Sequence, residues 1–220
     1  MKTSLSPNTE RGLTLLEIFV ILAVISVLAL LLMPALHRAK VRAQRISCVS
    51  HLKQIGLAYL VWEGDHTNLY PTQVSVTNGG TMEFTSGLNE FRHFLVMSNE
   101  LSTPKILVCP SDGTRIPATN FAFLRNSNIS FFVGVDANDT NPQLILAGDR
   151  NITNSTPIRN GILELTMNTP AGWTAELHNK VGNVLLSDGS VQQLSTLNLR
   201  DSVANAGVAT NRLQMPILTP

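Results

Sequence analysis

The chain has 220 residues, which is long enough for one domain with a hydrophobic core and an additional segment. Apolar residues make up 44% of it and charged residues 14%, and the formal net charge is +1. A charge this close to zero gives no reason to expect nucleic acid as a partner. The two cysteines, Cys48 and Cys109, are too few for a disulfide scaffold and lack the spacing of a zinc site, so no metal site is expected. A single bridge between them stays open for an exported protein.

Residues 13–33 form an apolar segment that only Thr14, Glu17 and Ser26 interrupt. At about 1.5 Å rise per residue, about 20 residues of helix span the hydrocarbon core of a bilayer. The segment therefore predicts a transmembrane helix. A buried helix of a soluble protein is the alternative, but such helices are rarely this uniformly apolar over this length.

A secretory signal peptide that is removed whole is a second alternative, because Lys2 and Arg11 precede the apolar segment. The segment is long for that role, and the residues that begin at Pro34 make a poor small-residue cleavage site. Glu17 is the stronger objection. A charge inside an apolar block is costly in a membrane and usually has a partner, which a discarded signal does not need.

The apolar segment begins with the sequence Arg11-Gly12-Leu13-Thr14-Leu15-Leu16-Glu17. This sequence resembles the prepilin peptidase site of type IV pilins and type II secretion pseudopilins, although Leu13 stands where Phe or Met is commoner. The resemblance implies cleavage between Gly12 and Leu13, methylation of the new terminus, and pairing of Glu17 with the free amino group of a neighbouring subunit. It also implies like subunits in a fibre, a prepilin peptidase and an inner-membrane assembly platform as partners. The chain would lie in a bacterial inner membrane, with its head in the periplasm or, once assembled, outside the cell.

Pro34 follows the apolar segment and is expected to kink the helix, which we predict to continue beyond it. A basic group comes next, consisting of Arg38, Lys40, Arg42 and Arg45. By the positive-inside rule this group would place the C-terminal side in the cytoplasm. The pilin resemblance implies the opposite orientation, and we favour it because a motif is more specific than a count of charges.

Residues 37–62 show the period of an amphipathic helix, with apolar side chains at Ile46, Val49, Leu52, Ile55, Tyr59 and Trp62. The expected organisation is a cleavable leader at 1–12, a transmembrane helix at 13–36, an amphipathic continuation at 37–62 and a globular head at 63–220. The expected fold class is α+β, in which the long N-terminal helix packs on an antiparallel sheet, as in pilins.

The head contains short apolar runs separated by Gly, Asn, Asp and Pro, which predict strands and turns. The expected strands are Ile106–Cys109, Ile129–Val135, Gln143–Ala147, Gly161–Thr166, Asn183–Ser187 and Val191–Leu194, with a short helix near Phe91–Met97. Asp188-Gly189 between the last two strands predicts a tight antiparallel hairpin, because both residues tolerate positive φ. The Asn-rich segments 136–142 and 150–160 are expected to be surface loops.

The head carries the motif His178-x9-Asp188-Gly189. Together with the leader, this motif resembles a pilin-like family of planctomycetes and verrucomicrobia, as do Cys109-Pro-Ser-Asp112 and the stretch from Cys48 to Gln54. The role of the motif is unknown. In the simplest interpretation, Asp188 caps the turn and His178 donates a hydrogen bond across to the strand.

Two chemical roles for this motif are alternatives to that interpretation. Hydrolysis is not expected, because the sequence offers no nucleophile elbow. We therefore expect no enzymatic activity and no cofactor. Calcium binding stays open as an alternative, because Asp188 with Asp112, Asp136 or Asp149 would supply oxygen ligands.

The function that these observations predict is a structural subunit of a type IV pilus-like or type II secretion pseudopilus fibre. The chain lacks a phosphate-binding Gly-Lys-Ser/Thr loop, so a separate ATP-driven machine would drive assembly. The alternative is a single-pass membrane-anchored binding protein whose exported head does not polymerise.

Overall fold

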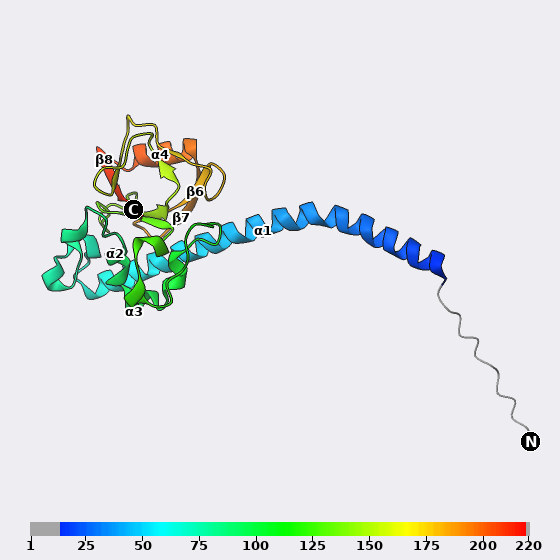
Figure 1. Ribbon diagram of the computed structural model, residues 1–220. Coiled ribbons are helices and arrows are strands. Elements are labelled where there is room, and N and C mark those ends of the chain that lie inside the picture. Colours follow the sequence, from blue (N-terminus) through cyan, green and yellow to red (C-terminus); the bar gives the residue numbers. More distant parts are fainter. Residues whose placement is uncertain (1–13, 219–220) are drawn as a thin grey trace, which may run out of the picture. The chain divides into compact units, whose positions relative to one another are not determined.

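A computed structural model describes residues 14–218 of the chain. The first element is the helix α1, Leu15–Asp65, which runs through Pro34 without ending there. This confirms that the helix continues past the proline. The chain divides into two compact units, and the boundary between them falls within α1, after Arg42. Figure 1 draws α1 from blue to cyan.

The part of α1 that precedes this boundary is long and apolar enough to cross a membrane. Every described residue from Thr14 to Ala43 is exposed within the chain. The first buried side chain of α1 is that of Cys48. The buried face of the helix continues through Leu52, Ile55, Tyr59 and Trp62. Most of the predicted amphipathic face is confirmed, but Ile46 is 61% exposed and does not belong to it.

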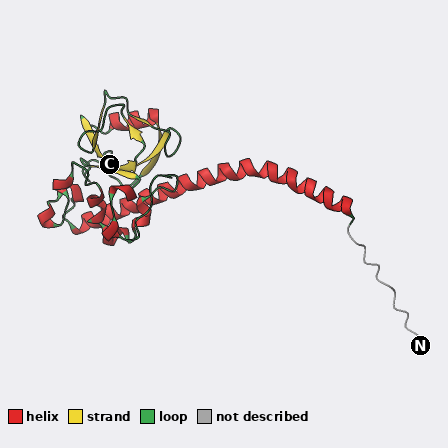
Figure 2. Ribbon diagram, viewed as in Figure 1, coloured by secondary structure: helices red, strands yellow, loops and turns green. Residues whose placement is uncertain are grey.

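The head contains a sheet in which every pair of neighbouring strands is antiparallel, in the order β4-β8-β1-β2-β6-β7. Its strands are β1 (Phe131–Gly134), β2 (Ile145–Asp149), β4 (Ile162–Thr166), β6 (Val181–Leu186), β7 (Val191–Ser195) and β8 (Thr210–Gln214). A separate two-stranded ribbon pairs β3 (Ile152–Thr153) with β5 (Gly172–Trp173). The remaining helices are α2 (Phe91–Leu95), α3 (Ser98–Leu101) and α4 (Thr196–Asn205). The α+β layout is thereby confirmed (Figure 2).

Both faces of the strands β1, β2 and β6 are buried, because helices cover both sides of the sheet (Figure 1). Successive side chains of a strand point to opposite faces. Along β1, Phe131 therefore packs in the core that includes the buried face of α1, whereas Phe132 packs in the core beneath α4. Along β6, Leu185 faces α1 and Val184 faces α4 in the same way. This two-sided burial explains why β1 and the first four residues of β2 are unbroken apolar runs.

Five of the six expected strands overlap β1, β2, β4, β6 and β7, and the last two of these form the predicted hairpin. The strand expected at Ile106–Cys109 is wrong, because Pro104–Leu107 forms a 3-10 turn. Pro104 suits the first position of that turn, and the Thr103 hydroxyl accepts a hydrogen bond from the Lys105 amide. The segment 150–160 is only partly a surface loop, since it contains β3 and buries Asn151 and Asn154.

Candidate functional site

The head brings together four chemically reactive side chains from segments that are far apart in the sequence. They are Cys48 on α1, Cys109 after the 3-10 turn, Asp149 at the end of β2 and His178 in the loop before β6. All four are buried, and one ligand atom of each lies within 4.8 Å of the others. We refer to these four residues as the Cys–Asp–His cluster.

Local structure explains how each member reaches the cluster. Cys48 occupies the same face of α1 as Leu52 and Ile55, so the helical period directs it into the core. Cys109 lies in a tight turn in which its carbonyl accepts a hydrogen bond from the Asp112 amide at 2.8 Å. Asp149 follows Gly148, where a Cβ atom would collide with the ring of Phe132 and with the backbone of β6. Glycine there lets β2 pack closely enough for Asp149 to reach β6.

The contacts inside the cluster converge on a common centre. The Cys48 Sγ donates to Asp149 Oδ1 at 3.1 Å, and the Cys109 Sγ lies 3.4 Å from His178 Nε2. The same ring nitrogen lies 3.4 Å from Asp149 Oδ2. Asn183 fixes that oxygen by donating from its backbone amide at 2.7 Å and from its side-chain amide at 2.8 Å.

The four groups of the cluster differ in how their surroundings shift their pKa values. Burial raises the pKa of the Cys48 thiol. The adjacent Cys48 thiol, reinforced by His178, lowers the pKa of Cys109 to about 5, against the effect of burial. Burial raises the pKa of Asp149 to about 6. Burial alone would lower the pKa of His178, but Cys109 and Asp149 outweigh it and raise that pKa.

This arrangement differs from a catalytic Cys–His–Asp relay. In such a relay the acid contacts the ring nitrogen that does not face the nucleophile. Here Cys109 and Asp149 approach the same nitrogen of His178. Cys109 is also fully buried, so its sulfur is not presented to a substrate. Donor atoms that converge on one point in a buried site are instead typical of metal ligation or of thiol pairing.

The two cysteines are free thiols in the structure, and both belong to the cluster. Their pairing in a disulfide stays a prediction. The positions of the two cysteines along the chain do not have the spacing of a zinc site. Asp149 and His178 lie on other segments, and only the fold brings them beside the cysteines.

The structure separates the two ends of the His-x9-Asp-Gly motif. His178 belongs to the Cys–Asp–His cluster, and the acid that it contacts is Asp149. Asp188 is exposed, and its carboxylate accepts a hydrogen bond from the Ser190 amide at 2.8 Å. Gly189 has φ of 78°, as the hairpin requires. Asp188 thus caps the turn as expected, whereas the expected hydrogen bond from His178 to the strand is replaced by contacts within the cluster.

The four carboxylates considered for calcium face different partners, and all four lie in the described part of the chain. Asp112 and Asp136 each pair with an arginine. Asp149 faces Cys48 and Asn183, and Asp188 caps its turn. The placement of these side chains does not support an oxygen-only site shared among them.

The predicted processing site, Gly12 and Leu13, lies outside the described residues. Glu17 is described, and it forms a capping box with Thr14 at the start of α1. The Glu17 carboxylate accepts from the Thr14 amide at 2.8 Å, and the Thr14 hydroxyl accepts from the Glu17 amide at 3.3 Å. Sequence reasoning missed this local role, although a Thr three residues before a Glu at the start of an apolar run is its usual signature.

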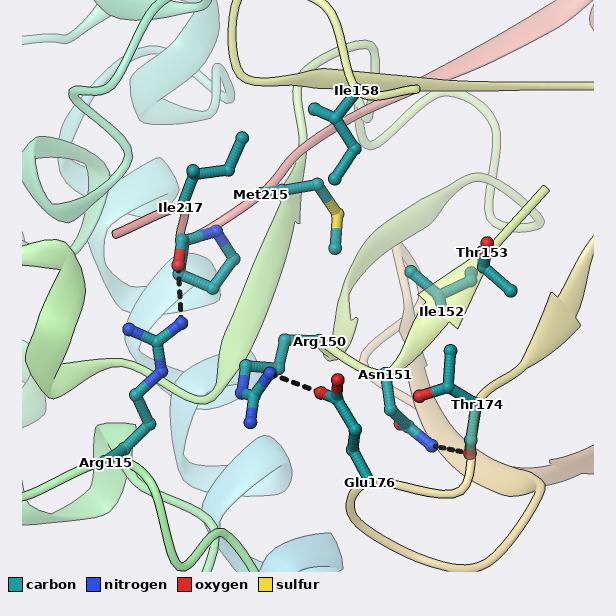
Figure 3. A pocket seen from close by; sticks show the side chains of 11 residues that line it. Arg115, Arg150, Asn151, Ile152, Thr153, Ile158, Thr174, Glu176, Met215 and Ile217 are labelled. Carbon is teal, nitrogen blue, oxygen red and sulfur yellow. Dashed lines mark hydrogen bonds and ion pairs between the residues drawn. The ribbon is translucent and has the colours of Figure 1, made fainter. Parts of the chain in front are cut away.

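A pocket of about 300 Å³ lies on the head and is lined by two arginines, Arg115 and Arg150 (Figure 3). Both guanidinium groups already have partners. Arg115 donates to the carbonyls of Asn126 and Pro216, and Arg150 pairs with Asp112 and with Glu176, which also lines the pocket. Carboxylates thus neutralise Arg150, whereas Arg115 contacts carbonyl oxygens and its Nε has no hydrogen-bond partner among the described residues.

No protein-family model matches this chain, and neither the curated proteins nor the solved structures contain a significant match to it. The resemblance to pilin-like proteins therefore remains a prediction from the motifs.

Proposed function

We propose that this chain is a structural subunit of a fibre of the type IV pilus or type II secretion pseudopilus kind. The observation that carries the proposal is the apolar first part of α1. Residues 14–42 are exposed throughout, and a single helix by itself offers no surface that could cover the apolar side chains among them. Burial of apolar surface contributes about 25 cal/mol per Å². Such a helix is stable only where lipid or like helices surround it.

The position of Glu17 favours like helices as the final partner. Ser26 is the other polar residue within the apolar part of α1. Its hydroxyl already has a partner in the same helix, since it donates a hydrogen bond to the Leu22 carbonyl at 2.7 Å. Glu17 carries a charge, which a capping role does not require, because glutamine also completes a capping box. A carboxylate in a low-dielectric surrounding attracts an opposite charge strongly. The free amino terminus of a processed neighbour is the basic group that the leader motif supplies.

The charge of Glu17 can be tested separately from its capping role. Glu17→Gln keeps an oxygen that accepts from Thr14 but removes the charge. We expect this variant to enter the membrane normally and to lose at least about nine-tenths of its sheared, sedimentable filaments, since one pK unit of lost pairing is already about 1.4 kcal/mol. The measurement is the filament yield from a bacterium that supplies a prepilin peptidase and its assembly machinery.

Ser26→Ala is the matched control, because it removes a polar group from the same helix without touching a charge, and it should leave the yield unchanged. The alternative function is a membrane-anchored binding protein that does not polymerise. That alternative is favoured if the unaltered chain is processed and inserted but yields no filaments. A Glu17→Gln variant that assembles as well as Ser26→Ala would sink the proposed charge pairing.

A further inference from the structure

We propose that the Cys–Asp–His cluster binds one Zn²⁺ ion in a tetrahedral site. The site lies wholly within residues 43–220, and the proposal does not depend on fibre assembly. The cluster is not explained by the proposed function, which uses only the first part of α1.

The donor set fits zinc by its chemistry. Structural zinc sites have four ligands drawn from thiolate, imidazole and carboxylate, and the cluster supplies two, one and one of these. Calcium and magnesium prefer oxygen ligands alone, so the two sulfurs disfavour them. With both thiols deprotonated and the imidazole neutral, the ligands carry three negative charges against two on the ion. Binding releases to solvent the protons that the ligand groups still hold.

Two contacts within the cluster are close to the edge lengths of a tetrahedral zinc site. Zinc forms bonds of about 2.3 Å to sulfur and about 2.0–2.2 Å to nitrogen and oxygen, which places a sulfur about 3.5 Å from a nitrogen or oxygen ligand. The Cys109 Sγ lies 3.4 Å from His178 Nε2, and the Cys48 Sγ lies 3.1 Å from Asp149 Oδ1. An ion at the centre therefore requires shifts of only a few tenths of an ångström at these two contacts.

The groups around the ligands hold them in place, as metal sites require. Asn183 donates twice to Asp149 Oδ2, which leaves Oδ1 directed at Cys48. The Arg45 guanidinium donates to the backbone carbonyl of His178 at 3.0 Å and so anchors the loop that carries this histidine. Both supporting residues also line a pocket of about 190 Å³ together with His178, so this histidine is the ligand that borders the pocket.

The competing outcome is a Cys48–Cys109 disulfide, which would consume both thiols. The test uses the full-length chain in detergent, reduced, freed of metal by a chelator and titrated with Zn²⁺ against a chromophoric competitor. We expect one equivalent to bind per chain. Titration with Co²⁺ should give the intense visible absorption of a tetrahedral ion together with thiolate charge-transfer bands.

Variants assign the binding to the cluster. Asp149→Asn and His178→Gln preserve side-chain size, and each should weaken Zn²⁺ binding by at least about 100-fold, because even supporting residues of metal sites contribute 10- to 100-fold. His51→Gln is the matched control. His51 lies on α1 one turn from Cys48, and its ring contacts the Val108 carbonyl outside the cluster, so this variant should bind normally.

Three results would overturn the proposal. The first is less than half an equivalent of Zn²⁺ bound by the reduced chain. The second is equal affinity of His178→Gln and His51→Gln. The third is an intact mass 2 Da below that of the reduced chain in exported protein isolated without reductant, which would identify the disulfide as the resident state.

Discussion

Asp112 and Arg150 form a bidentate ion pair that joins two of the segments carrying the Cys–Asp–His cluster. The Arg150 Nε donates to one carboxylate oxygen of Asp112 at 2.7 Å, and its Nη2 donates to the other at 3.0 Å. Asp112 lies three residues after Cys109, and Arg150 directly follows Asp149. The pair therefore fastens the Cys109 turn to the end of β2.

Replacing this carboxylate is expected to destabilise the head. Breaking a buried ion pair by removing one partner costs about 3–5 kcal/mol, so Asp112→Asn should lower the free energy of unfolding by about 3 kcal/mol. Chemical denaturation of the full chain in detergent measures the change. Asp188→Asn is the matched control, because Asp188 is exposed and asparagine also caps turns, and it should stay within about 0.5 kcal/mol. Equal stabilities of the two variants would contradict this role of the ion pair.

The environment of His93 is expected to make the stability of the folded chain depend on pH. It is buried, with Nδ1 2.7 Å from the Thr81 hydroxyl and Nε2 2.7 Å from the Gln214 side-chain oxygen. Burial lowers the pKa of His93 from 6.5 to about 4. Between these values the unfolded chain binds a proton that the folded chain does not, so the stability that His93 contributes is present above pH 6.5 and is lost as the pH falls toward 4.

The effect of His93 is isolated by comparison with His93→Gln, which cannot titrate. The difference in unfolding free energy between the two proteins should change by about 3 kcal/mol from pH 7 to pH 4, because one pK unit corresponds to about 1.4 kcal/mol. Denaturant titrations at several pH values provide the measurement. A difference that stays constant over this range would show that His93 does not titrate in this way.

Glu90 is a buried carboxylic acid whose two oxygens have no hydrogen-bond partner among the described residues. Burial raises its pKa well above 4.5, although the charge of Arg115 opposes the shift. At pH 7 the group therefore destabilises the folded chain, and this cost disappears as the pH falls toward 4.5. Glu90→Gln should raise the free energy of unfolding at pH 7 by about 1–3 kcal/mol.

Glu164→Gln serves as the control for Glu90, since Glu164 is exposed on β4 and its replacement should have little effect. The gain from Glu90→Gln should shrink when the measurement is repeated at pH 4.5. A loss of stability in Glu90→Gln at pH 7 would indicate that the ionised carboxylate pairs with Arg115 and stabilises the fold.

Local signals in the sequence predicted the elements that local interactions determine. The apolar run predicted the first part of α1, and Asp188-Gly189 predicted the hairpin between β6 and β7, because a turn depends on the conformations of a few neighbouring residues. β8 was not predicted. Its sequence, from Thr210 to Gln214, shows no apolar run, and it is a strand because it pairs with β1 and β4 on either side.

The Cys–Asp–His cluster could not be predicted from the sequence for a related reason. Its members lie on four elements, so their proximity is a property of the packed sheet and helix. The His-x9-Asp-Gly motif joins His178 with Asp188 along the chain, yet the hairpin directs Asp188 to solvent and Asp149 lies beside the histidine. The capping box of Thr14 and Glu17 is the opposite case, since its signal is local and was readable.

The most direct test of the proposed fibre subunit is the N-terminus of the chain after expression with a prepilin peptidase. Intact mass and N-terminal sequencing should show a chain that begins at methylated Leu13, with Glu17 as its fifth residue. A chain that still begins at Met1, or that is cut after residue 33, would contradict processing as a pilin and leave an anchored or secreted head.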